Sequence, residues 1–222
     1  MSLRRYVIMS FFFLVPEILM SDYTWITEHW IEIFGAVTGI IYVFLEIRKS
    51  IWLWPVGIVT SMIYVSVFFT SKFYADMSLQ LYYVVISFYG FYVWRYGIDT
   101  RNKREAQVPP AEGIHVSRTP LTLVKWLGGI YIVLHAAMWY ILAKFTDSPV
   151  AFWDSFTTAL SVIATWMLAR KYIEHWLLWV VVNIVSMILY IYKGLYPTTI
   201  LFLVYTVMAL VGYREWLKDI NR

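Results

Sequence analysis

The sequence has no cysteine and few charged side chains, and each shortage excludes a class of protein. Without cysteine the chain can form no disulfide, no thiolate metal site and no cysteine nucleophile. Only 14% of the 222 residues are charged, against about 25% in an average soluble domain, whereas 61% are hydrophobic. A water-soluble globule is therefore disfavoured. Fused kinase or ATPase modules are excluded because apolar runs occupy most of the length.

Motifs of common enzymes are missing as well. The sequence contains no Gly-rich phosphate loop, no HExxH zinc motif and no GxSxG nucleophile elbow. The pairs Glu28-His29 and Glu174-His175 lie near predicted helix ends, and two ligands are too few for a metal site. We expect a protein that is not an enzyme and holds no cofactor and no metal. A membrane-embedded enzyme or sensor is the less favoured alternative.

Long apolar runs are the dominant feature of what is present. A membrane-spanning helix needs about 20 mostly apolar residues. Hydropathy predicts seven such helices, at residues 30–47, 51–70, 77–95, 121–143, 150–168, 176–192 and 198–216. Aromatic residues make up 20% of the chain, and Trp and Tyr are enriched where helices meet the membrane surface. The sequence thus predicts an all-α polytopic membrane protein.

The positive charges predict its orientation. If successive loops alternate between the two sides of the membrane, one side receives only Lys72, Lys144 and Lys193. The other side receives 13 residues: Arg48, Lys49, Arg95, Arg101, Lys103, Arg104, Arg118, Lys125, Arg170, Lys171, Arg214, Lys218 and Arg222. Because basic loops stay in the cytoplasm, residues 96–120 and the C-terminus are expected there. The net charge of +4 therefore indicates orientation and not nucleic-acid binding.

A further, shorter apolar run covers residues 6–20, after Arg4-Arg5, and contains Pro16 and Glu17. It suits an additional N-terminal helix that either crosses the membrane or lies at its interface, and the sequence leaves both open. A secretory signal is disfavoured, because no small-x-small cleavage site follows before Asp22.

An internal repeat predicts the architecture. Residues 30–94 align without a gap on residues 152–216, an offset of 122, with 14 identities in 65 pairs, where composition alone gives roughly a tenth. Two units of three helices have the same orientation only if one further helix separates them, so we expect a parallel 3+1+3 arrangement. The predicted domains are an N-terminal segment (1–29), the first repeat (30–96), a loop with the linker helix (97–150) and the second repeat (151–217).

Four helices carry polar and aromatic stripes at spacings of three and four. Helix 176–192 presents Trp176, Trp179, Asn183, Ser186 and Tyr190. The ungapped repeat matches these with Trp54, Gly57, Ser61, Tyr64 and Phe68. A shift of three residues would instead match Trp54, Ser61 and Met62 with Trp179, Ser186 and Met187. Helix 77–95 presents Gln80, Tyr83, Ser87, Gly90 and Trp94, matched by Phe202, Tyr205, Ala209, Gly212 and Trp216.

Polar groups on a spanning helix need partners in protein or water, so these stripes are predicted to line the substrate path. The amides of Asn183 and Gln80 are the best candidates for ligand contact. Single Trp and Tyr residues more often pack between helices, Gly90 and Gly212 suit close helix contacts, and terminal Trp residues such as Trp94 and Trp216 suit the interfacial belt. The predicted substrate-binding residues are Trp54, Ser61, Tyr64, Gln80, Tyr83, Trp176, Trp179, Asn183, Ser186, Tyr190 and Tyr205.

Ionisable residues are missing from the middle of the repeat helices. The acidic residues of the spans, Glu32, Glu46, Asp76 and Asp154, all lie near helix ends. His135 lies mid-span in the predicted linker helix, where a hydrogen-bonded structural role is expected. Because ion-coupled carriers usually place an ionisable residue or a broken helix at the midplane, facilitated movement is favoured.

The motifs together resemble the PnuC family of bacterial nicotinamide riboside transporters. The residues that carry the resemblance are Trp52 to Ile58, Tyr74-Ala75-Asp76 with Leu79-Gln80, Tyr89-Gly90, Trp179 with Asn183 and Ser186, and Tyr192 to Thr198. The resemblance implies a fold similar to that of SWEET sugar transporters. It also implies a homotrimer in the bacterial inner (plasma) membrane and uptake by facilitated diffusion with trapping by cytosolic phosphorylation. Relatives thought to carry thiamine, riboflavin or deoxynucleosides, and a carbohydrate carrier, are the alternatives.

The predicted lining suits nicotinamide riboside. Its pyridinium is a flat cation, and a cation over an aromatic face gains roughly 0.5 to 2 kcal/mol, with Trp the best face. Asn183 and Gln80 can bond its carboxamide or ribose hydroxyls. The mononucleotide adds a phosphate, whose usual Arg or Lys partner is missing from the middle of the spans.

Overall fold

The computed structural model describes residues 33–70, 74–97, 114–146, 149–192 and 196–221. Two compact units divide at Gly39 and Ile40, and the account below concerns the larger unit, residues 40–222. The predicted N-terminal helix at residues 6–20 lies outside the described residues. Within those residues the fold is helical, with a single isolated β-bridge between Ser117 and Tyr172. The helices are Ile33–Ile47, α2 (Leu53–Thr70), α3 (Tyr74–Tyr96), α4 (Leu121–Phe145), α5 (Ala151–Ala169), α6 (His175–Tyr192) and α7 (Tyr196–Ile220).

The seven predicted helices all form, with ends that differ by a few residues from the hydropathy boundaries. The largest difference is at α7, which continues to Ile220, whereas the apolar run ends at Trp216. Its last turn is polar, and the ion pair of Lys218 with Glu215, three residues apart at 2.6 Å, supports the helix there. Hydropathy detects apolar segments only, so it misses a polar helix end.

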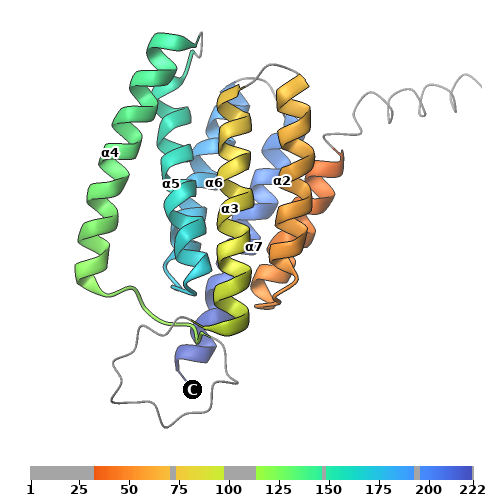
Figure 1. Ribbon diagram of the computed structural model, residues 1–222, viewed down its shortest axis with the longest axis vertical. Helices are drawn as coiled ribbons and strands as arrows, with labels where there is room; N and C mark the ends of the chain where they lie inside the picture. Colours follow the sequence, from red (N-terminus) through yellow and green to blue (C-terminus); the bar gives the residue numbers. More distant parts are fainter. Residues whose placement is uncertain (1–32, 71–73, 98–113, 147–148, 193–195, 222) are drawn as a thin grey trace, which may run out of the picture. The chain divides into compact units, whose positions relative to one another are not determined.

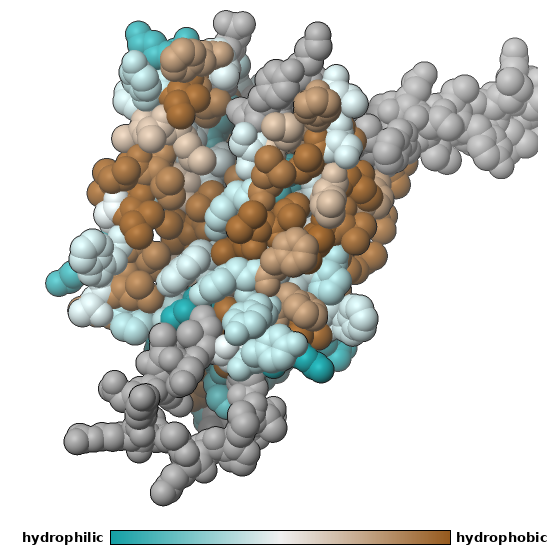
Figure 2. Space-filling view, in the orientation of Figure 1, coloured by the Kyte–Doolittle hydropathy of each residue, from teal (hydrophilic) through white to brown (hydrophobic). Residues whose placement is uncertain are grey.

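Four of the described helices are long and apolar enough to cross a membrane: α2, α4, α6 and residues 198–220 of α7. Their outward side chains are apolar and exposed, for example Val59 on α2 and Val133 on α4. On the face that Figure 2 shows, apolar side chains gather over the middle of the helices. Such a surface suits lipid and not water.

Helix α5 differs because it is surrounded by protein. It packs against α3, α4 and α6, and nine of its 19 residues are buried, among them Ser155, Ser161 and Thr165. Each of these hydroxyls donates a hydrogen bond to a backbone carbonyl three or four residues earlier. Small and hydroxyl side chains permit close helix packing. Helix α5 therefore lies in the interior of the bundle.

The remaining contacts pair α2 with α3 and α6 with α7, while α4 stands at the edge of the bundle (Figure 1). Each pair is closed by a tryptophan seated on a glycine. A Cβ at Gly90 would lie 2.3 Å from the indole of Trp54, and one at Gly212 would lie 2.5 Å from the indole of Trp176. The predicted close contacts at Gly90 and Gly212 are confirmed.

The corners before α2 and α6 have the same backbone conformation. Lys49 and Lys171 both adopt a positive φ of 53°, in the left-handed region that usually requires glycine. Ser50 N–H donates to Leu45 O, and Tyr172 N–H donates to Met167 O, at 2.9 and 3.0 Å. These bonds are related by the offset of 122 residues. The sequence repeat is therefore also a repeat of local structure.

One end of the bundle carries these corners together with the C-termini of α3 and α7, and we call it the basic end (Figure 1). Residues 114–120 cross this end before α4 begins. Ser117 N–H donates to Lys171 O, Ile173 N–H donates to Ser117 O, and the Glu174 carboxylate accepts bonds from Thr119 N–H and Oγ1, at 2.9 and 2.7 Å. The segment is thus tied to the α5–α6 corner.

Candidate functional site

The eleven predicted substrate-binding residues all lie away from the outer surface of the bundle. Five are buried, namely Trp54, Ser61, Trp176, Asn183 and Ser186, with exposed fractions of 0 to 8%. The other six are half-buried: Tyr64, Gln80, Tyr83, Trp179, Tyr190 and Tyr205. On α6, by contrast, the opposite face carries Val181, Ile184 and Ile188, with exposed fractions of 40 to 57%. The stripe of α6 therefore faces protein, and its other face suits lipid.

The structure resolves the ambiguity in the repeat register. Trp54 lies on Gly90 of the neighbouring helix, and Trp176 lies on Gly212 in the same way. The ungapped offset of 122 residues relates these two pairs, so Trp54 is equivalent to Trp176. Trp179 is then equivalent to Gly57.

The position of Trp179 shows how the two repeats differ. A Cβ at Gly57 would lie 3.1 Å from both Ser87 Oγ and the ring of Tyr42, so these two side chains fill the space next to the glycine. The repeat equivalents of Tyr42 and Ser87 are Ala164 and Ala209, both buried alanines. The first repeat thus has a glycine beside a tyrosine and a serine, and the second has Trp179 with alanines at the two equivalent positions.

Four buried indole N–H groups have no hydrogen-bond acceptor among the described residues: those of Trp54, Trp94, Trp176 and Trp179. Buried donors in proteins are nearly always paired with protein or with water. A ligand with carbonyl or hydroxyl oxygens can satisfy such donors, and Trp179 lies one turn from the buried amide of Asn183. This part of α6 therefore offers a polar aromatic molecule an aromatic ring for stacking and hydrogen-bond donors.

Aromatic side chains gather toward the other end of the repeat helices. Tyr190 and Phe202 have ring centroids 5.0 Å apart, and Phe202 and Tyr205 lie 5.7 Å apart. Tyr64 stacks on Phe68 at 5.8 Å and is electrostatically coupled to Tyr205. Predicted site residues of α2, α6 and α7 are thus neighbours in this group.

Helix α3 contacts α5 through one of its tyrosines, Tyr82. Tyr82 Oη donates to Val162 O at 2.8 Å, and its ring lies 5.6 Å from that of Tyr83. The predicted stacking residue Tyr83 is therefore next to the contact between α3 and α5.

Trp94 and Trp216 are not interfacial belt residues, contrary to the prediction. They are only 6% and 0% exposed. Trp94 packs edge-on against Trp54 at 5.5 Å, and Trp216 packs edge-on against Trp176 at 5.8 Å. Their positions at helix ends suggested the belt, but each is covered by a tryptophan of its own repeat, and their two rings also lie 6.4 Å apart across the repeats. The spacing of residues along one helix does not predict which of them other helices bury.

His135 has the structural role that was expected. Its Nδ1 lies 3.1 Å from Ser155 Oγ, whose own proton is donated to Phe152 O. The imidazole therefore donates through Nδ1. Its ring is stacked on Tyr131 at 5.7 Å. These contacts tie α4 to α5.

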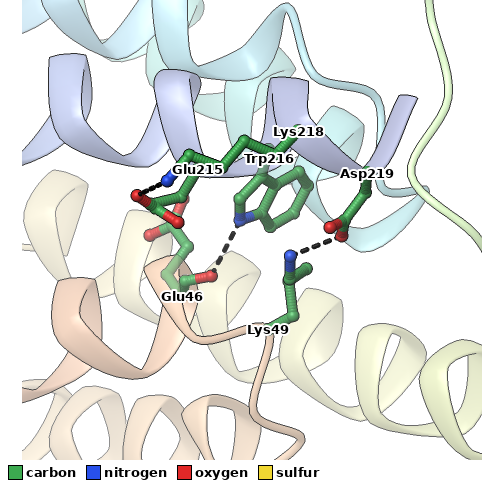
Figure 3. Close-up of polar contacts among 6 residues, drawn as sticks. All are labelled: Glu46, Lys49, Glu215, Trp216, Lys218 and Asp219. Atoms are coloured by element: carbon green, nitrogen blue, oxygen red, sulfur yellow. Dashed lines mark hydrogen bonds and ion pairs between the residues drawn. The ribbon is translucent and has the colours of Figure 1, made fainter. Parts of the chain in front are cut away.

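The sequence reasoning missed two features of the basic end that involve ionisable groups. Glu46 and His175 form a hydrogen-bonded pair, with Oε1 and Nε2 2.9 Å apart and side chains 3% and 0% exposed. Nearby, Lys49 is paired with Asp219 (Figure 3), and Lys171 Nζ lies 4.4 Å from the ring centroid of Trp94. Burial, together with the charge of Lys49, lowers the pKa of Lys171 to about 8. Glu46 and His175 stand 129 residues apart, so no local pattern could pair them.

The comparisons with known proteins agree on one family of membrane transporters. A family model described as nicotinamide mononucleotide transporter matches residues 29–218. The nicotinamide riboside transporter PnuC of Escherichia coli is 25% identical over 206 residues, covering 86% of each chain. The riboflavin/roseoflavin transporter RibM of Streptomyces davaonensis is 22% identical over 191 residues, covering 84% of each. A crystal structure of the vitamin B3 transporter PnuC matches the fold with a TM-score of 0.68 and 23% identity, over 93% of this chain and 88% of the other.

Proposed function

Because this chain belongs to the nicotinamide mononucleotide transporter family, we propose that it carries nicotinamide riboside across the bacterial inner membrane. The observation that carries the proposal is the family match over residues 29–218, together with similarity to a nicotinamide riboside transporter over 86% of this chain. The exposed apolar surfaces of α2, α4, α6 and α7 suit a multi-pass position in the bilayer.

The ligand-contact residues form the second part of the proposal. Trp179 offers an aromatic face and an unpaired indole N–H, and Asn183 offers both donors and acceptors one turn away. The pyridinium of nicotinamide riboside is a cation that gains energy over an indole face without a carboxylate. Its carboxamide can exchange hydrogen bonds with Asn183 and Gln80. Tyr83, Tyr205 and the remaining stripe residues complete the lining.

The riboside suits this lining better than the mononucleotide of the family description. A phosphate dianion prefers Arg or Lys as a partner. The described spans place their Lys and Arg residues near helix ends, as in Arg95 of α3 and Lys218 of α7. The hydroxyls of a neutral ribose need only hydrogen-bond partners. Asn183, Gln80 and the serines of α2 and α6 can provide them.

The architecture behind this function is a parallel 3+1+3 bundle with the domain boundaries 1–29, 30–96, 97–150 and 151–217. The repeated corners at Lys49 and Lys171 and the repeated Trp–Gly seats support it. Helix α4 is then the linker. The basic end faces the cytoplasm because basic segments are retained there. Three copies of the chain assemble in the membrane, each with its own path.

Movement of substrate is by facilitated diffusion, and phosphorylation in the cytosol traps the product. Support comes from the position of the ionisable side chains. Glu46 and His175 lie at the last turn of one helix and the first residue of α6, and not in the middle of the spans. A carrier driven by an ion gradient usually has its ionisable group near the midplane.

A binding titration tests the proposed function. Purified protein in detergent is titrated calorimetrically with nicotinamide riboside, nicotinamide mononucleotide, riboflavin, thiamine, deoxythymidine and glucose. We expect heat of binding with nicotinamide riboside at the lowest concentration. Saturable binding of riboflavin without binding of the riboside would reassign the chain to the role named for its Streptomyces davaonensis relative. Binding of none would overturn a vitamin carrier.

A further inference from the structure

The buried pair of Glu46 and His175 lies outside the stripes of proposed ligand-contact residues. Glu46 belongs to the last turn of helix Ile33–Ile47, and His175 is the first residue of α6. A third helix joins them, because the indole N–H of Trp216 in α7 donates to the backbone oxygen of Glu46 at 3.2 Å (Figure 3). Three helices of both repeats therefore meet at this pair.

The hydrogen bonds of His175 define how many protons the pair holds. Nδ1 lies 2.6 Å from the carbonyl oxygen of Tyr172, and a carbonyl only accepts, so Nδ1 carries a hydrogen. Nε2 lies 2.9 Å from Glu46 Oε1, and a bond there needs one further proton. That proton sits either on the imidazole facing a carboxylate or on the carboxyl facing a neutral imidazole. In both forms the net charge of the pair is zero. The deprotonated pair, a neutral histidine with an ionised glutamate, has one proton fewer.

Loss of that proton would leave an ionised carboxylate facing a nitrogen lone pair. Both side chains are almost completely buried, and the imidazole lies 4.7 Å from the ring of Trp176 and 4.8 Å from that of Trp216. A buried charge without a partner is among the most costly arrangements in a protein. The closed contact between the three helices therefore depends on the proton.

The repeat supplies an internal comparison for the pair. The position equivalent to Glu46 is Leu168, and the position equivalent to His175 is Leu53; both leucines are at most 1% exposed. The same place in the other half of the bundle is thus filled by two apolar side chains. Buried ion pairs are often no more stabilising than apolar residues of similar size. Packing alone does not call for an acid and an imidazole here.

Tyr42 and several charged side chains lie around the pair. Tyr42, one turn earlier on the helix of Glu46, is close enough to interact electrostatically with the carboxyl. From α7, Lys218 pairs with Glu215 and Asp219 pairs with Lys49 (Figure 3). From the α5–α6 corner, Lys171 lies over Trp94. The proton of the pair therefore belongs to Glu46 and His175.

We propose that Glu46 and His175 form a site that binds one proton, and that this proton keeps the basic end of the bundle closed. Release of the proton separates residues 40–47 from α6 and α7 and opens that end. In the proposed topology the basic end faces the cytoplasm, so the site makes inward opening easier as cytoplasmic pH rises. This consequence for transport rests on the proposed function, whereas the opening itself does not.

The size of the effect follows from proton counting. Once opened to water, histidine titrates near pH 6.5 and glutamate near 4.3, so above about pH 6.5 the open pair has lost the proton that the closed pair holds. A difference of one proton changes an equilibrium constant about tenfold per pH unit. The opening constant should therefore rise by about tenfold per unit from pH 6.5 upward, until the closed pair itself releases its proton.

Hydrogen exchange followed by mass spectrometry measures this opening in peptides that cover residues 40–50 and 171–180, at several values between pH 6.5 and 8.5. Rates are corrected for the intrinsic pH dependence of amide exchange. The wild type is compared with Glu46→Gln, whose amide can still donate to Nε2 but does not titrate. A second variant, Glu46→Leu with His175→Leu, copies the apolar contact of the other repeat. Residues 121–145 of α4, remote from the pair in sequence, serve as the reference peptide.

We expect an excess rise of about tenfold per pH unit in the wild type and none in either variant. A wild type without the excess overturns the proposal, whether or not the variants fold. Variants as pH-dependent as the wild type overturn it as well. Calorimetric binding of nicotinamide riboside, measured on the same samples, separates the two proposals, because failure to bind rejects the function and leaves the proton site standing.

Discussion

Trp179 has a glycine, Gly57, as its equivalent in the first repeat, and this difference makes the interior of the bundle asymmetric. Tyr42 and Ser87 lie beside Gly57, and the equivalent positions in the second repeat are the buried Ala164 and Ala209. A planar ligand held against Trp179 therefore meets a different surface on each side. Next to it, Asn183 is 5% exposed and suited to the polar edge of such a ligand.

Replacement of Asn183 by leucine should weaken binding of nicotinamide riboside. The leucine keeps roughly the same volume but removes the donors and the acceptor of the amide. An unpaired buried group on the ligand costs about 1 to 3 kcal/mol, which corresponds to roughly a fivefold to hundredfold rise in Kd measured by calorimetry. Val181→Leu, on the exposed face of the same helix, is the control and should bind as the wild type does.

Should Asn183→Leu and Val181→Leu bind equally well, the stripe of α6 is a packing surface and the substrate path follows another face. Thermal unfolding of both variants checks that the fold is kept.

Replacement of Gly212 by alanine should destabilise the protein. The added Cβ would lie 2.5 Å from the indole of Trp176, so the tryptophan or the helix must move. Overpacking of this kind costs about 1 to 3 kcal/mol. A thermal unfolding scan in detergent should therefore show a lower Tm. In Gly128→Ala nothing lies within 4 Å of the new Cβ, so its Tm should not fall. Equal behaviour of the two variants would contradict the close contact.

At the scale of elements, the corners before α2 and α6 carry the strongest evidence for the repeat. A lysine in the left-handed conformation costs roughly 1 to 2 kcal/mol relative to glycine, yet both corners retain one. Lys49 is paired with Asp219, and the same carboxylate also acts to raise the pKa of Lys171, but burial and the charge of Lys49 outweigh it. The position equivalent to Asp219 is Gly97, so Lys171 has no corresponding aspartate of its own. Lys171 instead contacts the face of Trp94. The two corners have the same backbone conformation, but their lysines have different partners.

This difference predicts a pH-dependent stability at the α5–α6 corner. The pKa of Lys171 is about 8 in the folded protein and 10.5 in an unfolded chain, so between these values the unfolded state binds more protons and stability rises with pH. Lys171→Met removes a charge that is costly below pH 8. Its Tm should exceed that of the wild type at pH 7, and the gain should shrink as pH rises toward 10.

Lys125→Met removes an exposed lysine of α4 and controls for the loss of one positive charge. A gain in Tm for Lys171→Met that stays constant from pH 7 to pH 10 would show that burial of the charge is not its cause.

At the scale of the whole molecule, the proposed topology can be checked with tags. A tag between residues 101 and 112 should be accessible only from the cytoplasm, and tags at residues 147 and 193 only from outside, because basic segments are retained in the cytoplasm. Protease accessibility in spheroplasts and in inverted vesicles measures this. If all three tags are accessible from one side, the 3+1+3 arrangement must be abandoned.

Transport by the whole molecule should be passive. In vesicles without the phosphorylating enzyme, internal nicotinamide riboside should rise to the outside concentration and stop there, with or without a proton or sodium gradient. The proton bound by Glu46 and His175 changes how readily one end opens, but it supplies no driving force if it returns to the side it came from. Accumulation that an ionophore abolishes would rule out facilitated diffusion.

The sequence by itself determined the helices, the family and the repeat, because each depends on information carried along the chain. Apolar runs long enough to span a bilayer specify helices in any context, since backbone polar groups must be paired within lipid. The sequence predicted a repeat between residues 30–94 and 152–216 and close contacts at Gly90 and Gly212. The structure contains these contacts and also two corners with the same backbone conformation at Lys49 and Lys171.

Only the tertiary structure decided which side chains meet across the bundle. Trp94 and Trp216 stand at helix ends, where a single helix would place them at the membrane surface, and opposing helices bury them instead. The repeat register depended on which tryptophan lies on which glycine. Glu46 and His175 carry no local signal, because one belongs to an apolar helix end and the other to a corner 129 residues away. Their shared proton exists only because folding removes both side chains from water and leaves each as the other's partner.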